Sequence, residues 1–170
     1  KDRTGIVVAL ALLAVGVDKD RTARVVDSVA RLGFIVHSED PRRQIVACAG
    51  APICAAAEIP ARTLAPDLAD SAAIAGRDAP MVHVSGCAKG CACARPAPVT
   101  VVGYNGRCGV VVNGSARDQP LALLVSGALP GALARLAETV GRLRVGDESA
   151  AEERSHLDRA QIVRLLHGEA

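Results

Sequence analysis

The sequence has very few aromatic side chains: one Phe, one Tyr and no Trp among 170 residues. Proteins that bind single-stranded nucleic acid stack bases on aromatic rings and follow the phosphate backbone with a basic groove. Phe34 and Tyr104 are far apart in the chain, and no long block of Lys or Arg accompanies them. The formal net charge is only +2 with His neutral. We therefore expect no nucleic-acid partner.

Long hydrophobic runs are also missing. The longest apolar segment, residues 5–17, is too short for a bilayer, which needs about 20 residues. It lacks the small-residue cleavage site of a signal peptide, so we predict a buried strand over 6–15 and no membrane partner. Without a secretory signal we expect a reduced, cytoplasmic setting, where cysteines bind metals more often than they form disulfides. Because Lys1 replaces an initiating Met, we expect a truncated N-terminus.

The spacing of apolar residues indicates an α+β protein. A helix over 21–32, ended by Gly33, lies between the predicted strands 6–15 and 34–36 and would form a β–α–β unit with them. The Asn105-Gly106 pair predicts a hairpin turn, since both turn positions need positive φ. The remaining predictions are strands at 45–47, 81–85, 99–104 and 108–112, and helices at 53–75 (broken at Pro60), 132–143 and 150–166.

Four of the six cysteines form two pairs, Cys48-x5-Cys54 and Cys87-x3-Cys91. Each pair follows a predicted short strand and lies among Gly, Ala and Pro residues. Small residues let the backbone curl around an inorganic cube and leave amide N–H groups free to point at sulfur. A cubane cluster requires four thiolates. We therefore predict that these four cysteines are the ligands of one 4Fe–4S cluster.

Other interpretations of the cysteines stay open. Structural zinc favours C-x2–4-C pairs, which the second pair fits and the first does not. Cys93 is either an alternative ligand or a redox-sensitive thiol, and the sequence does not decide between them. We expect Cys108 to be a small, half-buried hydrophobic residue. His83 alternates with two valines in a predicted strand, and we expect it to have a structural role. No residue is assigned a catalytic role.

The C-x5-C and C-x3-C pair resembles the cluster signature of the siroheme-dependent nitrite and sulfite reductase superfamily, over about residues 43–112. Within it, the sequence is most similar to the precorrin-3B synthase family. The reductases usually carry Asn between their last two cysteines, whereas Ala88-Lys89-Gly90 resembles the synthases. The segments with the greatest similarity are 46–54, 82–91 and 96–103, preceded by Gly33-Phe34 and Asp40-Pro41.

The resemblance implies an α+β fold, in which a nitrite/sulfite reductase-like 4Fe–4S domain follows the end of a ferredoxin-like half-domain. The expected division is 1–42 for the end of the half-domain, 43–145 for the cluster-binding domain and 146–170 for a C-terminal helical tail. Complete family members are more than twice as long. We therefore expect this chain to be a C-terminal half that lacks most of the basic residues that hold the tetrapyrrole.

The function implied is that of an oxidoreductase of aerobic cobalamin biosynthesis. Such an enzyme hydroxylates precorrin-3A with dioxygen and closes a lactone, and an electron donor supplies its cluster. Lys89 is the best candidate to contact a tetrapyrrole carboxylate. The alternative is the C-terminal part of a siroheme-dependent sulfite or nitrite reductase, in which Cys91 would also bridge to the siroheme iron. A non-catalytic iron–sulfur carrier, a zinc-stabilised module and an inactive remnant stay open too.

Overall fold

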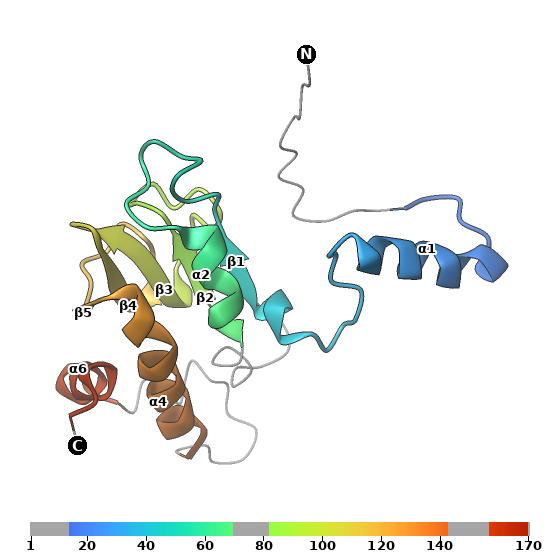
Figure 1. Cartoon of the computed structure of the whole chain (residues 1–170). Helices are drawn as coiled ribbons and strands as arrows, with labels where there is room; N and C mark the ends of the chain where they lie inside the picture. The colour runs from blue at the N-terminus through green and yellow to red at the C-terminus, as the bar shows by residue number, and fades with distance from the viewer. Residues whose placement is uncertain (1–13, 70–81, 143–156, 170) are drawn as a thin grey trace. The chain divides into compact units, whose positions relative to one another are not determined.

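The computed structural model describes residues 14–69, 82–142 and 157–169 (Figure 1). The chain divides into two compact units, Lys1–Asp40 and Pro41–Ala170. None of the helices within the described ranges is both long and apolar enough to cross a membrane.

The first unit contains α1 (Lys19–Arg31), which confirms the helix predicted at 21–32. Gly33 follows it with a φ of +87°, a conformation that glycine adopts without steric cost. The strand predicted at 34–36 is wrong, and so is the β–α–β unit among the described residues. A short apolar run becomes a strand only beside a partner, and Phe34 instead remains 38% exposed. The strand predicted at 6–15 lies outside the described residues except for 14 and 15, which are irregular.

The second unit is built on a five-stranded sheet whose strands follow one another in chain order (Figure 1). The second strand is parallel to both the first and the third, whereas the fourth is antiparallel to both the third and the fifth. Four of them confirm predicted strands, and the fifth was not predicted. The strands are β1 (Ile45–Ala47), β2 (Val82–Ser85), β3 (Ala97–Tyr104), β4 (Arg107–Gly114) and β5 (Ala122–Leu124).

The hairpin between β3 and β4 confirms the turn predicted from the sequence. Asn105 and Gly106 have φ values of 51° and 70°, as a two-residue turn of the primed type requires. This turn fixes the register of the longest strand pair, from Tyr104↔Arg107 to Ala97↔Gly114.

Three helices and two short 3-10 helices complete the described part of this unit. The helix predicted at 132–143 is confirmed, and the described end of the one predicted at 150–166 is helical. The prediction at 53–59 is wrong, because these residues form turns and a helix begins only after Pro60. The elements are η1 (Pro41–Gln44), α2 (Ala61–Asp67), η2 (Ser126–Ala128), α4 (Leu129–Arg142) and α6 (Arg159–His167).

The main core lies between one face of the sheet and the helices α2, α4 and α6 (Figure 1). Its side chains are aliphatic apart from Cys108, which agrees with the scarcity of aromatic residues. Val84, Val101 and Val110 from three neighbouring strands are fully buried there, and Leu68 and Leu129 meet them from the helix side. This face supports the strand ends where the cysteines lie.

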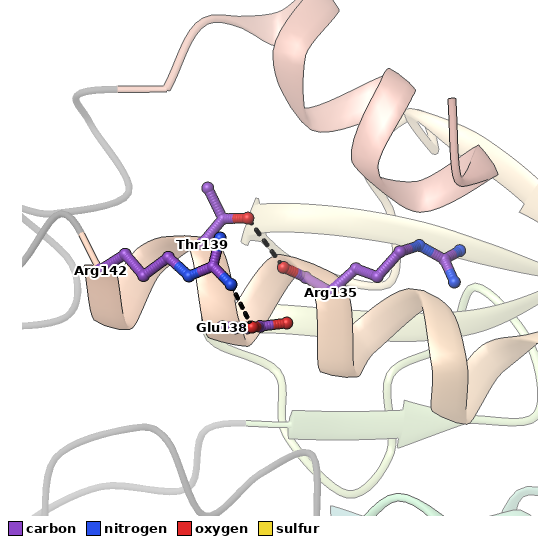
Figure 2. Close-up of polar contacts among 4 residues, drawn as sticks. All are labelled: Arg135, Glu138, Thr139 and Arg142. Atoms are coloured by element: carbon purple, nitrogen blue, oxygen red, sulfur yellow. Dashed lines mark hydrogen bonds and ion pairs between the residues drawn. The ribbon is translucent and has the colours of Figure 1, made fainter. Parts of the chain in front are cut away.

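Polar contacts on α4 attach the last helix to this core. The guanidinium of Arg135 donates to the carbonyl oxygens of Leu165 and Leu166, at 2.9 and 3.1 Å, at the end of α6. The Leu165 carbonyl also accepts from the amide of Gly168. Figure 2 shows that this side chain extends away from Arg142, which forms an exposed ion pair with Glu138 one turn earlier on the helix.

Candidate functional site

The four predicted ligands lie on two loops that leave the carboxyl ends of neighbouring strands. The first cysteine loop, residues 48–60, follows β1, and the second cysteine loop, residues 86–96, follows β2. Because β1 and β2 are parallel with Ala47 opposite Val84, both loops start at the same edge of the sheet. The structure therefore brings Cys48 close to the start of the loop that carries Cys87 and Cys91.

A hydrogen bond to sulfur joins the two loops. The amide N–H of Gly86 donates to Sγ of Cys48 at 3.1 Å, and the amide of Cys48 donates to the carbonyl of Val84 at 3.1 Å. An amide N–H that points at a cysteine sulfur stabilises the thiolate, which is the form that binds a metal. Cys48 is thus a predicted ligand whose sulfur already accepts a backbone hydrogen bond from the second loop.

Glycines allow the loops to approach so closely. A Cβ atom at Gly86 would lie 2.5 Å from Cβ of Ala57 and 3.2 Å from Cα of Gly50. Gly50 has a φ of +67°, and a Cβ there would collide with the backbone amide of Ala61. The two glycines pack backbone against backbone, with no space for a side chain between them.

Backbone hydrogen bonds hold the first cysteine loop in place. Its end is tied to the second loop by the amide of Glu58, which donates to the carbonyl of Gly86 at 2.7 Å. The Glu58 carboxylate also accepts from the amide of Gly106 at 2.9 Å, so the loop is attached to the β3–β4 turn. Within the loop, Cys54 donates to the carbonyl of Gly50 at 2.9 Å and accepts from Ala57 at 3.0 Å.

The second cysteine loop is hydrogen-bonded to the end of β2 and is exposed to solvent near Cys91. The hydroxyl of Ser85, itself buried, donates to the carbonyl of Cys87 at 2.7 Å. Gly90 has a φ of +64°, which makes the turn before Cys91. Lys89 and Cys91 are exposed, and Cys87 is half-buried. A large ligand would therefore reach this loop from the solvent side.

These residues fit a 4Fe–4S cluster by their chemistry. All four cysteines are free thiols, Cys91 exposed and the other three half-buried, and one already accepts an amide hydrogen bond. Across the described ranges, no three His, Cys, Asp or Glu side chains converge tightly enough to bind a single metal ion. The assignment of Cys48, Cys54, Cys87 and Cys91 as cluster ligands stays a prediction.

The two other cysteines have different environments. Cys93 is half-buried, and its Sγ lies 3.5 Å from the carbonyl oxygen of Arg95. Cys108 is fully buried in the main core, more than the half-buried position we expected, because β4 is covered by a neighbouring strand on each side and by the helices. Burial raises the pKa of the Cys108 thiol, which opposes the thiolate form that a metal ligand needs.

His83 belongs to this region, although the sequence indicated only a structural role. Its side chain is 1% exposed, and neither ring nitrogen has a hydrogen-bond partner in the part of the chain that the structure describes. Burial lowers its pKa, which favours the neutral imidazole. The sequence signal that could have pointed to His83 is a polar residue in the middle of a short strand that leads into a cysteine loop.

Known proteins resemble the chain in sequence and in fold, although no protein-family model matches it. It is 37% identical over 142 residues to a precorrin-3B synthase from Sinorhizobium sp, which covers 83% of this chain and 31% of that protein. It therefore spans about a third of the length of this curated relative. The solved structure of the Mycobacterium tuberculosis NirA protein matches with a TM-score of 0.64 and 20% identity, over 85% of this chain and 31% of that one. The predicted resemblance is thus confirmed: the chain is a homologue of one part of precorrin-3B synthase and has an α+β fold of the nitrite/sulfite reductase type.

Proposed function

We propose that this chain is the cluster-binding part of a tetrapyrrole-modifying oxidoreductase of the precorrin-3B synthase type. The observation that carries the proposal is the 37% identity to a synthase over 142 residues. The hydrogen bond from Gly86 to the sulfur of Cys48, where two cysteine loops meet, supports the cluster itself. Since the chain spans 31% of its relative, a complete enzyme would draw on further residues to enclose its substrate.

Each of the two loops would supply two cysteine ligands. Cys48 and Cys54 from the first loop, with Cys87 and Cys91 from the second, would hold the 4Fe–4S cluster. Such a cluster supplies single electrons at a potential that depends on hydrogen bonds to its sulfurs and on solvent exposure. The amide of Gly86 provides one such hydrogen bond, and Gly86 and Gly50 are both buried where the two loops meet.

The substrate would approach from the exposed side of the second cysteine loop. A tetrapyrrole carries several carboxylates, and Lys89 is exposed between two predicted ligands, where its ammonium would pair with one of them. The proposed reaction is the dioxygen-dependent hydroxylation of precorrin-3A with lactone formation, with electrons from a separate donor. We place this reaction in the cytoplasm, where thiols stay reduced and free for a cluster.

The proposal is tested by loading the 170-residue chain with iron and sulfide under anaerobic conditions. We expect about four irons and four sulfides per chain, with a broad absorption shoulder in place of sharp bands. The Cys48→Ala variant should lose most of this iron. Its matched control, Cys108→Ala, removes a thiol from the core and should keep it. A folded wild-type chain that takes up zinc but no iron or sulfide would overturn the proposal.

A second candidate function is the C-terminal part of a siroheme-dependent sulfite or nitrite reductase. The observation that favours it is the fold shared with NirA at a TM-score of 0.64. If this chain were part of such a reductase, Cys91 would be shared between the cluster and the siroheme iron, and the exposure of Cys91 is compatible with such a bridge. Sharp haem-type absorption bands after addition of siroheme to the loaded chain, abolished by Cys91→Ala, would favour this candidate over the synthase.

A further inference from the structure

The face of the sheet opposite the main core is partly polar, and it meets the second cysteine loop at His83. His83 and Thr100 are register partners on β2 and β3, so their side chains lie on the same side of the sheet. Both are at most 1% exposed. Thr100 is satisfied, because its hydroxyl donates to the carbonyl of Gly114 at 2.8 Å. The imidazole of His83 has no such partner among the described residues.

The ring of His83 lies directly under Gly90. A Cβ placed on Gly90 would be 3.8 Å from Cε1 of His83, and 3.3 Å from the carbonyl oxygen of Cys93. Cε1 is the ring carbon between the two nitrogens, so the polar edge of the imidazole faces the stretch between Cys87 and Cys91. The imidazole nitrogens of His83 are therefore turned toward the loop and not toward solvent.

An unpartnered imidazole in this position is costly. A buried donor or acceptor without a partner is destabilising, and native proteins rarely leave one unsatisfied. Burial lowers the pKa of His83, so the ring is neutral and has one N–H to donate. Lys89, the nearest charge along the second loop, is exposed and does not offer an acceptor. The acceptors that the proposed function would bring to this loop are sulfurs.

We propose that His83 is a positioning residue of the cluster site: its buried imidazole N–H donates a hydrogen bond to a sulfur of the cluster or of its cysteine ligands in the second loop. This inference rests on the proposed function, because the sulfur acceptor is part of the cluster site. A hydrogen bond to sulfur stabilises the reduced, more negative cluster, so His83 raises the reduction potential. It also keeps the second loop closed over the sheet.

The test compares midpoint potentials of the loaded 170-residue chain, measured by redox titration with detection of the reduced cluster by electron paramagnetic resonance. His83→Leu keeps the volume but removes the donor, and its potential should shift to more negative values. His83→Gln restores an N–H, and its potential should return toward that of the wild type. The matched control is Thr100→Val on the same face, which should lower the stability to urea and leave the potential unchanged.

Three results would overturn the inference. One is an unchanged potential in His83→Leu, and another is an equal shift in His83→Leu and His83→Gln, since a shift without rescue reflects burial alone. The third needs no variant: the wild-type chain labelled with 15N-histidine should show a nitrogen coupled to the reduced cluster in pulsed resonance spectra, and its absence excludes all four histidines. A wild-type chain without iron would instead refute the proposed function, and this inference would fall with it.

Discussion

The substitution Gly86→Ala tests whether the packing of the two cysteine loops holds the site together. Gly86 is the residue whose amide donates to Cys48, and its Cα faces the first loop. The added methyl group would lie 2.5 Å from Cβ of Ala57, 3.2 Å from Cα of Gly50 and 3.3 Å from Cα of Ala57. Carbon atoms pack best at about 3.5–4.0 Å, so the first loop must move away.

The cost follows from what must move. Two of the three close neighbours are backbone atoms, which cannot rotate aside as a long side chain would. Overpacking a site of this kind costs typically about 1–3 kcal/mol. The methyl group also pushes against the loop that the Glu58 amide ties to the Gly86 carbonyl, so the hydrogen bond between Gly86 and Cys48 should lengthen or break. We therefore expect both a loss of stability and a loss of iron.

The assay is urea unfolding of the 170-residue chain followed by circular dichroism, with iron quantitation after loading. The control is Gly127→Ala, because a Cβ at Gly127 has no neighbour within 4 Å. The control should be neutral or stabilised by about 0.4–1 kcal/mol, since alanine restricts the unfolded chain. If Gly86→Ala is as stable as this control and binds as much iron, the close contact between the loops is refuted.

Three further predictions concern other parts of the second unit. Arg135→Ala should destabilise the chain by about 2 kcal/mol, because two charge-assisted hydrogen bonds to the last carbonyls of α6 are lost, and it should expose the α6 amides to hydrogen exchange. The control Arg142→Ala, which breaks only an exposed ion pair, should destabilise it by about 0.3–0.5 kcal/mol. Two hydrogen bonds from Ser115 lower the pKa of the Asp118 carboxyl below its ordinary value of 3.8. Their contribution to the free energy of unfolding is therefore complete above pH 3.8 and is lost as the pH falls through the lowered pKa. Urea midpoints measured at several pH values should therefore converge between wild type and Asp118→Asn in acid, and a constant difference would contradict this. Lys89→Ala should weaken binding of uroporphyrin to the loaded chain about fivefold, as loss of about 1 kcal/mol implies, whereas equal weakening in Arg142→Ala would show that only net charge matters.

Local sequence signals predicted the elements that local interactions determine. Asn105 and Gly106 specify their own turn by tolerating positive φ, and the aliphatic runs on both sides pair as a direct consequence. The helix over Leu129–Arg142 follows from apolar residues at helical spacing, of which Leu133, Leu136 and Val140 are buried. In these cases the sequence contains both the conformational preference and the surface that will be buried.

The errors arose where a tertiary partner decides the structure. The segment Phe34–Val36 has β-branched residues but no neighbouring strand within the described part of its unit, so its preference is not realised. Residues 53–59 are rich in alanine, yet they form turns because the loop must reach Gly86 and the β3–β4 turn. Neither partner is visible from the segment itself.

The candidate site was predicted in part. The spacing of Cys48, Cys54, Cys87 and Cys91 indicated the ligand set, and the parallel pairing of β1 with β2 places their two loops at one edge. The structural role expected for His83 did not include the role that we propose, because an alternating pattern shows which face a residue lies on and not what covers that face. The covering segment is the loop that follows the same strand and folds back over it at Gly90, which only the structure identifies.

The second cysteine loop also explains why the two faces of the sheet differ. Parallel strands need a return connection of about a dozen residues or more, usually a helix. Between β2 and β3 that connection is the loop itself, which contains only turns and bends. Helices supply aliphatic side chains to the face that carries Val84 and Val101, whereas the backbone of a loop at Gly90 lies against the His83 ring on the other face. This face also carries the small apolar cluster of Val102, Val111 and Ala116, so its polar residues are the part that meets the second cysteine loop. A change at His83 should therefore affect the cluster site more than a change of equal size on the helix-covered face.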